Sequence, residues 1–265
     1  MNDMSKLFRN IFLAIVVPAL MFMNLSTVLA QGGPPMLTDD SSTPGNGNWE
    51  NNFSVGFQGT SKNYLLAFPQ LDLNYGLGER IQLKIEAPWV KEGGEPLANK
   101  FDHITLGMKY MLLDEDSDGI FLSVYPQPII SFNPDDHTNR TEYGIILPVA
   151  ASKQFFKTGV NVQIGYQVLG SEKEIFYGLV VDHPLGKYLL VLGEIHSTIG
   201  RKDVSGSFPD DEIYFRAGTF VNLGIQFKPS DAYFINLAAG KDIESGPIFT
   251  SSAKYYGYFG LQLNM

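Results

Sequence analysis

Polar and apolar residues alternate along most of the chain with a period of two. In residues 159–168, GVNVQIGYQV, every second side chain is apolar, and the positions between are Asn, Gln or Gly. This period is typical of extended β-strands, whose successive side chains point to opposite faces, and differs from the 3.6-residue period of a helix. About twelve strands are predicted in this way, at residues 51–58, 65–75, 81–88, 103–112, 120–131, 142–152, 158–169, 175–183, 188–199, 213–227, 232–239 and 254–265.

The lengths of these segments and of their connections point to a membrane barrel. A tilted strand crosses a bilayer with about 9–11 residues, and most segments are near that length. Short turns at one end and long loops at the other are typical of outer-membrane barrels. The connections alternate in this way, apart from two brief links near 59–64 and 170–174. The short turns fall near 76–80, 113–119, 153–157, 184–187 and 228–231, and the long loops near 89–102, 132–141, 200–212 and 240–253. We expect an all-β fold, a transmembrane antiparallel β-barrel of about 12 strands over residues 49–265, with both termini in the periplasm.

The first 48 residues lie outside the predicted barrel. Residues 1–30 combine the basic Lys6 and Arg9, an apolar run and a small-residue site ending at Ala30, which predict a cleaved secretory signal peptide. An uncleaved anchor is the alternative, although the apolar run is shorter than the roughly 20 residues of a membrane helix. Residues 31–48, QGGPPMLTDDSSTPGNGN, show no period, and we expect them to be a flexible N-terminal segment.

The chain is acidic and contains no cysteine. It has 28 Asp and Glu residues against 19 Lys and Arg residues, a formal charge of −9. Removal of residues 1–30 takes away Asp3, Lys6 and Arg9 and changes that charge to −10. An acidic surface argues against a nucleic-acid partner, because phosphates require basic side chains. Without cysteine there is no disulfide framework and no lipid attached to a cysteine.

Charged residues of the predicted strands fall on one phase of the alternation. In residues 71–89, LDLNYGLGERIQLKIEAPW, the apolar phase would face lipid and the charged phase the lumen, because a charge facing lipid is unfavourable. The predicted charged ring of the lumen comprises Asp72, Lys84, Glu86, Lys109, Glu142, Asp182, Glu194, Arg216 and Lys254. These five acids and four bases are nearly balanced. They would either form a constriction that selects solutes or an ion-pair network that stiffens a narrow barrel.

Aromatic residues share the inward phase. They are Phe176, Tyr214, Phe220, Tyr256 and Tyr258. Such rings would either line a path for an aromatic or aliphatic solute or fill the interior of a small barrel.

The C-terminal segment has the pattern of a strand that the barrel-insertion machinery recognises. Tyr258, Gly260, Leu263 and Met265 have the spacing of that strand, with methionine in place of the usual terminal aromatic residue. We therefore expect the insertion machinery to be a partner during assembly, and the lipids of a bacterial outer membrane to surround the finished barrel.

The sequence predicts no catalytic, metal-binding or cofactor-binding site. Residues 114–119, DEDSDG, resemble the opening of a calcium loop, but the twelfth position, which requires a bidentate acid, is Tyr125. We interpret these residues as an acidic turn. His196 and Ser197 are adjacent and would point to opposite faces of a strand, so together they do not form a catalytic pair. We predict that the protein is not an enzyme and binds no cofactor.

Several motifs resemble those of the phenol-degradation meta-pathway (MetA-pathway) family of outer-membrane transporters. The motifs are LDLNYGL (71–77) with Arg80, Glu86 and Pro88, GMKYMLL (107–113) before the acidic turn, Gly193-Glu194, and Asn222-Leu223-Gly224 ahead of FKPSD (227–231). The similarity covers most of the chain from about Tyr64 to the end. It implies a porin-like β-barrel for the uptake of small hydrophobic or aromatic compounds, and it supplies no catalytic residue.

These features together predict an outer-membrane transporter or channel. A small hydrophobic or aromatic compound would pass through it by passive or facilitated diffusion. Two alternatives remain open: a lipid-modifying barrel enzyme, and a structural or adhesive barrel with a closed lumen.

Overall fold

The computed structural model describes residues 33–59, 64–93, 98–132, 141–203, 213–243 and 254–265. The predicted signal peptide, residues 1–30, lies outside these described residues. One short helix, α2 (Glu115–Asp118), lies between the fifth and sixth strands. The strands are β1 (Trp49–Gly59), β2 (Tyr64–Gly76), β3 (Ile81–Gly93), β4 (Ala98–Phe101), β5 (His103–Leu113), β6 (Phe121–Val124), β7 (Gln127–Ser131), β8 (Glu142–Phe155), β9 (Thr158–Leu169), β10 (Glu172–Pro184), β11 (Leu189–Asp203), β12 (Ile213–Ser230), β13 (Tyr233–Asp242) and β14 (Tyr255–Asn264).

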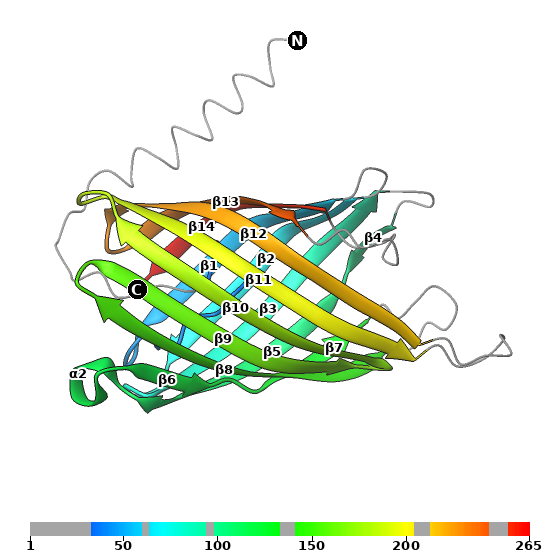
Figure 1. The fold of residues 1–265 in the computed structure, drawn as a ribbon, viewed down its shortest axis with the longest axis horizontal. Coiled ribbons are helices and arrows are strands. Elements are labelled where there is room, and N and C mark those ends of the chain that lie inside the picture. The colour runs from blue at the N-terminus through cyan, green and yellow to red at the C-terminus, as the bar shows by residue number, and fades with distance from the viewer. Residues whose placement is uncertain (1–32, 60–63, 94–97, 133–140, 204–212, 244–253) are drawn as a thin grey trace, which may run out of the picture.

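The strands form one antiparallel sheet that closes into a barrel (Figure 1). β1 pairs with β14 from Glu50↔Asn264 to Gly59↔Tyr255, which joins the first strand to the last. β6 and β7 share one position between β5 and β8, and β4 is a short addition paired with the far end of β3. The fourteen strands therefore occupy twelve positions around the barrel. The predicted all-β barrel of about 12 strands is confirmed.

The segment predicted as one strand over 120–131 is interrupted at Pro126, between β6 and β7. The amide of Tyr125 donates to the carbonyl of Pro148 across this break at 3.0 Å. In an antiparallel strand, the amide nitrogen and the carbonyl of one residue point to the same neighbouring strand. The nitrogen of Pro148, which carries no hydrogen, therefore faces the break as its carbonyl does. Proline is tolerated inside β8 because the ladder on that side is already interrupted.

The short turns gather at one end of the barrel, which we call the turn end, together with the C-terminus (Figure 1). Gly78 and Gly186 occupy the β2–β3 and β10–β11 turns with φ of 71° and 87°, the left-handed region that glycine adopts readily. The opposite end, the loop end, carries the long connections, most of whose residues lie outside the described ranges.

The predicted acidic turn forms the short helix α2. The carboxylate of Asp114 caps its start by accepting from the amide of Asp116 at 3.0 Å. The backbone amide of Asp114 and the hydroxyl of Ser117 donate to Asp118, and they hold the pKa of Asp118 below its ordinary value. These acidic residues therefore bond to one another's backbone in a capped turn.

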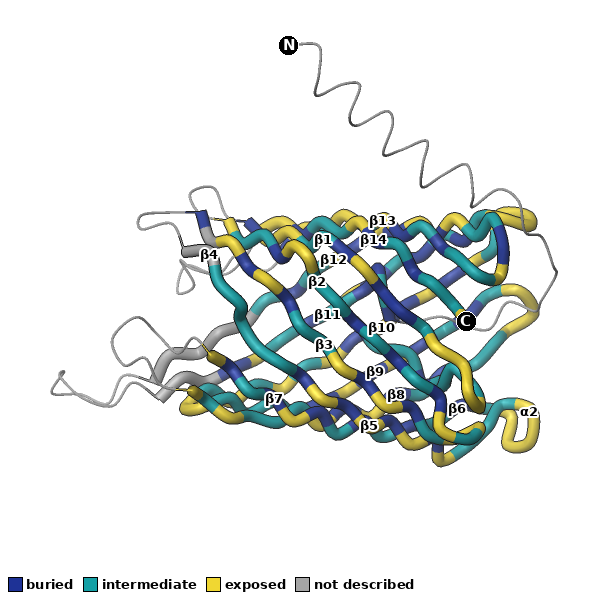
Figure 2. Tube along the Cα trace, turned by 180° about the vertical axis from the view of Figure 1, so that it is seen from behind, coloured by how far each residue is buried: buried dark blue, intermediate teal, exposed yellow. Residues whose placement is uncertain are grey.

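The two faces of the wall follow the predicted alternation (Figure 2). In β9, Val162 and Ile164 are 46% and 58% exposed, whereas Asn161 and Gln163 beside them are 0% and 5% exposed. Outward apolar side chains and inward polar ones are what a barrel presents to lipid and to its lumen. Among the described residues, no helix is long and apolar enough to span a membrane.

We expect Ile164→Arg to prevent or strongly destabilise folding into lipid. Ile164 lies midway along β9 on the outer face, where an arginine costs about 2–4 kcal/mol at the bilayer midplane. Urea titration in lipid vesicles, followed by the different migration of heated and unheated samples on detergent gels, measures the loss. The matched control is Leu185→Arg in the β10–β11 turn, where the cost falls to about 0–1 kcal/mol. Equal losses in both variants would contradict the assigned orientation.

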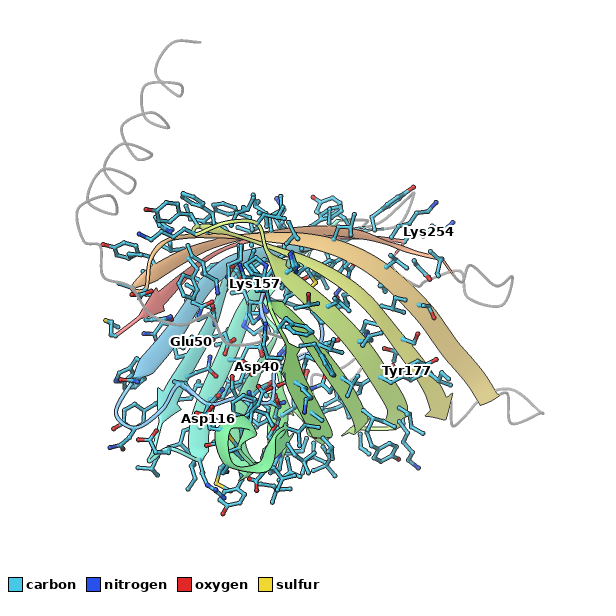
Figure 3. The ribbon with its side chains drawn as sticks, turned by 60° about the vertical axis from the view of Figure 1, so that its left-hand side comes forward. Asp40, Glu50, Asp116, Lys157, Tyr177 and Lys254 are labelled. Atoms are coloured by element: carbon cyan, nitrogen blue, oxygen red, sulfur yellow. The ribbon has the colours of Figure 1, made fainter. Side chains whose placement is uncertain are left out.

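Residues 31–48 were expected to be a flexible segment, but residues 33–45 run through the barrel interior, and residues 46–48 are exposed beside the β2–β3 turn. Thr38 and Ser41 in this part are 0% exposed and Met36 is 6% exposed. Figure 3 shows Asp40 inside the barrel, whereas Tyr177, which is 46% exposed, lies on its outer wall. The segment has little regular structure of its own, so its backbone groups need polar partners on the wall. We call residues 33–45 the plug segment.

Candidate functional site

The plug segment is held at one side of the lumen by the carboxylate of Glu194 on β11. Its two oxygens accept the amides of Thr38 at 2.7 Å and Leu37 at 3.2 Å. The amide side chain of Asn222 on β12 donates to the same carboxylate at 2.5 Å. Glu194 is only 3% exposed, so its carboxylate is largely removed from water. These charge-assisted bonds replace the lost hydration.

Three amide side chains of the wall hold Asp39 at the centre of the plug segment. The backbone amide of Asp39 donates to Gln163 at 3.2 Å, and its backbone carbonyl accepts from Asn161 at 2.7 Å. Gln127 on β7 donates to the Asp39 carboxylate at 3.4 Å. The Asn and Gln residues of the inward phase therefore satisfy an irregular backbone inside the barrel.

An ion pair holds the other side of the segment. The ammonium of Lys109 on β5 lies 2.5 Å from the Asp40 carboxylate and 3.1 Å from the carbonyl of Ser42. The same ammonium lies 4.9 Å from the ring centre of Tyr125, within cation–π range. Next to it, the hydroxyls of Ser41 and Ser152 are 2.5 Å apart. The segment is thus anchored to both halves of the barrel wall.

The wall also contacts the plug segment through an apolar cluster and two glycines. Met36 packs in a buried cluster with Val180, Leu190 and Leu192. Nearby, one inward position on β10 and one on β12 are glycines: a Cβ at Gly178 would overlap the Thr38 hydroxyl, and one at Gly224 would overlap the end of Met36. Only residues without a side chain leave room for the segment at these positions.

A second charged group lies on β2 and β3 beside the plug segment. The ammonium of Lys84 is 3.1 Å from Glu86 and 3.6 Å from Asp72. Gln70 donates to Glu86 at 3.0 Å and Asn74 donates to Asp72 at 3.0 Å. One base therefore lies between two acids, in a network that continues into neighbouring amides.

Two cavities of the described lumen lie on either side of the plug segment. The loop-side cavity has a volume of about 420 Å³ and reaches Leu65 and His103 near the loop end. The turn-side cavity, of about 350 Å³, reaches Asp231 at the β12–β13 turn. Four residues line both cavities: Pro34, Asp39, Asp72 and Lys84. Two of these four belong to the plug segment, so the segment is part of the partition.

The nine predicted lumen charges do not form one ring. Asp72, Lys84, Lys109, Asp182 and Glu194 are buried on the inward face, and Glu86 lies half-buried beside them. Glu142 is the first residue of β8, at the loop end, and Asp182 lies two residues before the end of β10, at the turn end. Lys254 is exposed at the loop-end rim (Figure 3), and the side chain of Arg216 lies outside the described residues. The charges therefore occupy several levels of the lumen.

Three of the predicted inward aromatic residues line the loop-side cavity: Phe176, Tyr256 and Tyr258. Phe176 stacks on His196 with ring centres 6.1 Å apart. The hydroxyl of Tyr256 donates to the carbonyl of Pro35 at 2.9 Å, so this residue also holds the plug segment. Phe220 is half-buried on β12, and the side chain of Tyr214 lies outside the described residues.

Sequence reasoning missed Asp39, Asp40 and Tyr125 as lumen residues. The two aspartates belong to a stretch without periodicity, where no phase assigns a face. Tyr125 lies in the break between β6 and β7, and its ring covers Gly107, where a Cβ would come within 2.7 Å of it. An available signal for Tyr125 was the proline that follows it, because proline marks a break in the ladder.

Comparison with known proteins identifies the type of fold. No family model matches the chain, and no curated protein matches it. An outer membrane channel from Pseudomonas putida F1 is 12% identical with a TM-score of 0.60, over 91% of this chain and 99% of that chain. The fold is that of outer-membrane β-barrel channels. The KdgM porin in complex with disordered oligogalacturonate is 9% identical, with a TM-score of 0.51 over 81% of this chain and 98% of that one. The NanC porin is 11% identical, with a TM-score of 0.51 over 80% and 97%.

No metal site is found in the part of the chain that the structure describes. Within those ranges, no three His, Cys, Asp or Glu side chains are grouped to hold an ion. The inward acids instead bond to Lys84, to Lys109 and to amides. The arrangement is suited to holding a polypeptide segment and to presenting charge to a solute.

We expect Glu194→Leu to loosen the plug segment. The change removes the acceptor of two segment amides, and hydrogen bonds to a charged group contribute about 1.5–3 kcal/mol each. In a Ser41→Cys background, whose thiol is the only one in the chain, a water-soluble maleimide should react at least about tenfold faster. The control is Glu115→Leu, because Glu115 accepts the amide of Gln154 away from the segment. An unchanged reaction rate would show that Glu194 does not restrain the segment.

Proposed function

We propose that the protein is an outer-membrane channel that passes a small hydrophobic or aromatic solute by passive or facilitated diffusion, and that this structure is its closed state. The position of the plug segment between two cavities of the lumen carries the proposal. A barrel whose only role is structural would gain from a packed interior, as small barrels commonly have. Here the interior keeps about 420 and 350 Å³ open on either side of a single segment.

A bacterial outer membrane is the location that fits this proposal. The outward face of the wall is apolar over the length of the strands, as in Val162, Ile164 and Leu179. The predicted signal peptide and the C-terminal strand pattern support export and assembly by the barrel-insertion machinery. Outer-membrane lipids would then contact the outer wall.

The solute class rests on the side chains of the loop-side cavity. Phe176, Tyr256 and Tyr258 offer ring faces to a solute that enters from the loop end. The resemblance of the sequence motifs to the phenol-degradation meta-pathway transporters supports the same class. An aromatic compound would bind these rings and move on when the plug segment is displaced.

The lipid-modifying enzyme is the less favoured alternative. His196 lines the loop-side cavity, so its neighbour Ser197 points to the outer face, where its hydroxyl lies 2.8 Å from that of Thr219. A hydroxyl and an imidazole do meet in Thr158 and His183, 2.9 Å apart. Asp182, next to His183, points into the lumen instead, so this pair lacks the orienting acid of a catalytic triad on its own strand.

Planar-bilayer recordings and liposome uptake of a labelled aromatic compound test the channel. Purified full-length protein should produce discrete openings and accelerate uptake relative to protein-free liposomes. A difference in migration before and after heating shows that the protein is folded. If folded protein produces neither conductance nor uptake, the result would favour a closed structural barrel. Release of fatty acid from phospholipid vesicles by the same preparation would instead favour the enzyme.

A further inference from the structure

Among the residues that the structure describes, those lining the loop-side cavity carry an excess of negative charge. Five carboxylates line it: Asp39, Asp72, Glu86, Asp102 and Glu174. Within the described ranges, the cationic side chains that line it are one ammonium, Lys84, and two imidazoles, His103 and His196. Lys84 is already shared between Asp72 and Glu86, and His103 lies 2.8 Å from Asp102. In a narrow lumen with low-dielectric walls, such an imbalance concentrates cations and repels anions.

Phe176 and His196 face Asp72 and Glu86 across the lumen. Phe176 and His196 lie on β10 and β11, six of the twelve positions around the barrel from β2 and β3, which carry Asp72 and Glu86. Glu174 lies two residues before Phe176 on the same face of β10. A solute between the walls would therefore meet ring faces and a carboxylate on one side and further carboxylates on the other.

Glycines keep this cavity open beside two of its side chains. A Cβ at Gly165 would overlap the ring of Phe176. A Cβ at Gly200 would come within 2.7 Å of the Glu174 side chain. Phe176 and Glu174 can thus lie flat along the wall instead of filling the cavity. The remaining volume of about 420 Å³ is within the usual range of small-molecule sites.

We propose that the loop-side cavity binds small organic cations that carry an aromatic ring, such as protonated aromatic amines. The ring of the solute stacks on the Phe176–His196 pair, and its ammonium group lies near Glu174 or Glu86. Ring faces and carboxylates both attract a cation, whereas a carboxylate solute of the same shape meets like charge. This inference rests on the proposed channel function, whose solute class it narrows from aromatic compounds to aromatic cations.

Equilibrium binding to the purified full-length protein tests the inference without requiring passage. Three probes share one ring and differ in charge: benzylammonium, benzyl alcohol and phenylacetate. Calorimetry at moderate salt should give benzylammonium about tenfold or greater preference over benzyl alcohol, with phenylacetate the weakest. Equal binding of the three, or tighter binding of phenylacetate, would overturn the proposal. The comparison uses the unaltered protein, so no variant has to fold for the result to count.

Substitutions locate the binding. Glu174→Gln should weaken benzylammonium several-fold and leave benzyl alcohol unchanged, whereas Phe176→Leu should weaken both. Asp116→Asn on the exposed turn α2 removes the same charge outside the lumen and should change neither. If Asp116→Asn and Glu174→Gln weaken benzylammonium equally, the acidic chain attracts cations in general and the site does not exist. Glu86→Gln serves the same test if Glu174→Gln fails to fold on the heated and unheated gel.

The outcomes also separate this inference from the proposed function. Charge-selective binding without uptake into liposomes supports the site and argues against the channel. Uptake of all three probes at equal rates, with equal binding, supports the channel and overturns the site.

Discussion

Removal of residues 33–42 is expected to raise the conductance of the barrel several-fold. Two of the four residues that line both cavities, Pro34 and Asp39, disappear in this variant, and Asp72 and Lys84 remain on the wall. The two cavities would then join into one water-filled path. Residues 43–48 are kept because Asn46 and Gly47 bond to the β2–β3 turn. Single-channel recording in planar bilayers measures the change.

A point variant tests the same opening without shortening the chain. Gly178→Leu places a side chain where the Thr38 hydroxyl lies, so the plug segment must leave its position. Gly193→Leu is the matched control, because a Cβ at Gly193 meets only the Leu223 side chain at 4.0 Å. We expect high conductance in the first variant and ordinary conductance in the second. If the deletion variant folds but conducts no better than the unaltered protein, the lumen is closed by something other than the plug segment.

A disulfide between residues 41 and 152 should lock the channel shut. The hydroxyls of Ser41 and Ser152 are 2.5 Å apart, close to the roughly 2.05 Å of a sulfur–sulfur bond, so Ser41→Cys with Ser152→Cys needs little movement. The chain contains no other cysteine, so the bond formed is unambiguous. Oxidised protein should lose the openings seen in the unaltered protein, and a reductant should restore them. Recording before and after addition of the reductant to the same bilayer measures both states.

The single variants Ser41→Cys and Ser152→Cys are the controls for this lock. Each loses the same hydroxyl contact but has no second thiol within the chain, so neither should respond to the reductant. Mass spectrometry verifies the bond in the oxidised double variant. If that oxidised protein conducts as well as its reduced form, solutes pass beside the segment. The disulfide should lower the conductance and the deletion should raise it. Both effects are expected only if the plug segment is the gate.

The wall could be predicted from sequence because each strand side chain points either to lipid or to the lumen. A charge such as Lys84 cannot face lipid without a large penalty, so its phase fixes that of its neighbours, Leu83 and Ile85. The same argument predicted the inward position of Glu194. It weakens at strand ends, where the choice is no longer between lipid and lumen, and Lys254 is exposed there.

The plug segment could not be predicted, because its composition is also that of a disordered tail. Gly, Pro, Ser and Asp bury little apolar surface, so no hydrophobic period marks a partner. The segment is held instead by polar atoms of the wall, such as the carboxylate of Glu194 and the side-chain amide of Asn161. The sequence assigns these residues to the inward face but does not indicate what they bind. Asp39 and Asp40, which enter the lumen with this segment, were outside the predicted set of lumen charges for the same reason.

The anchors of the plug segment have a consequence for assembly. Thr38 and Glu194 are separated by 156 residues, and Pro35 and Tyr256 by 221. Contacts between such distant residues form late, after the strands that carry them are in place. We therefore expect each newly inserted barrel to pass through a leaky interval in which its wall is complete and its lumen is open. The barrier between the periplasm and the exterior would then be sealed by the arrival of the N-terminal segment, after β1 has joined β14.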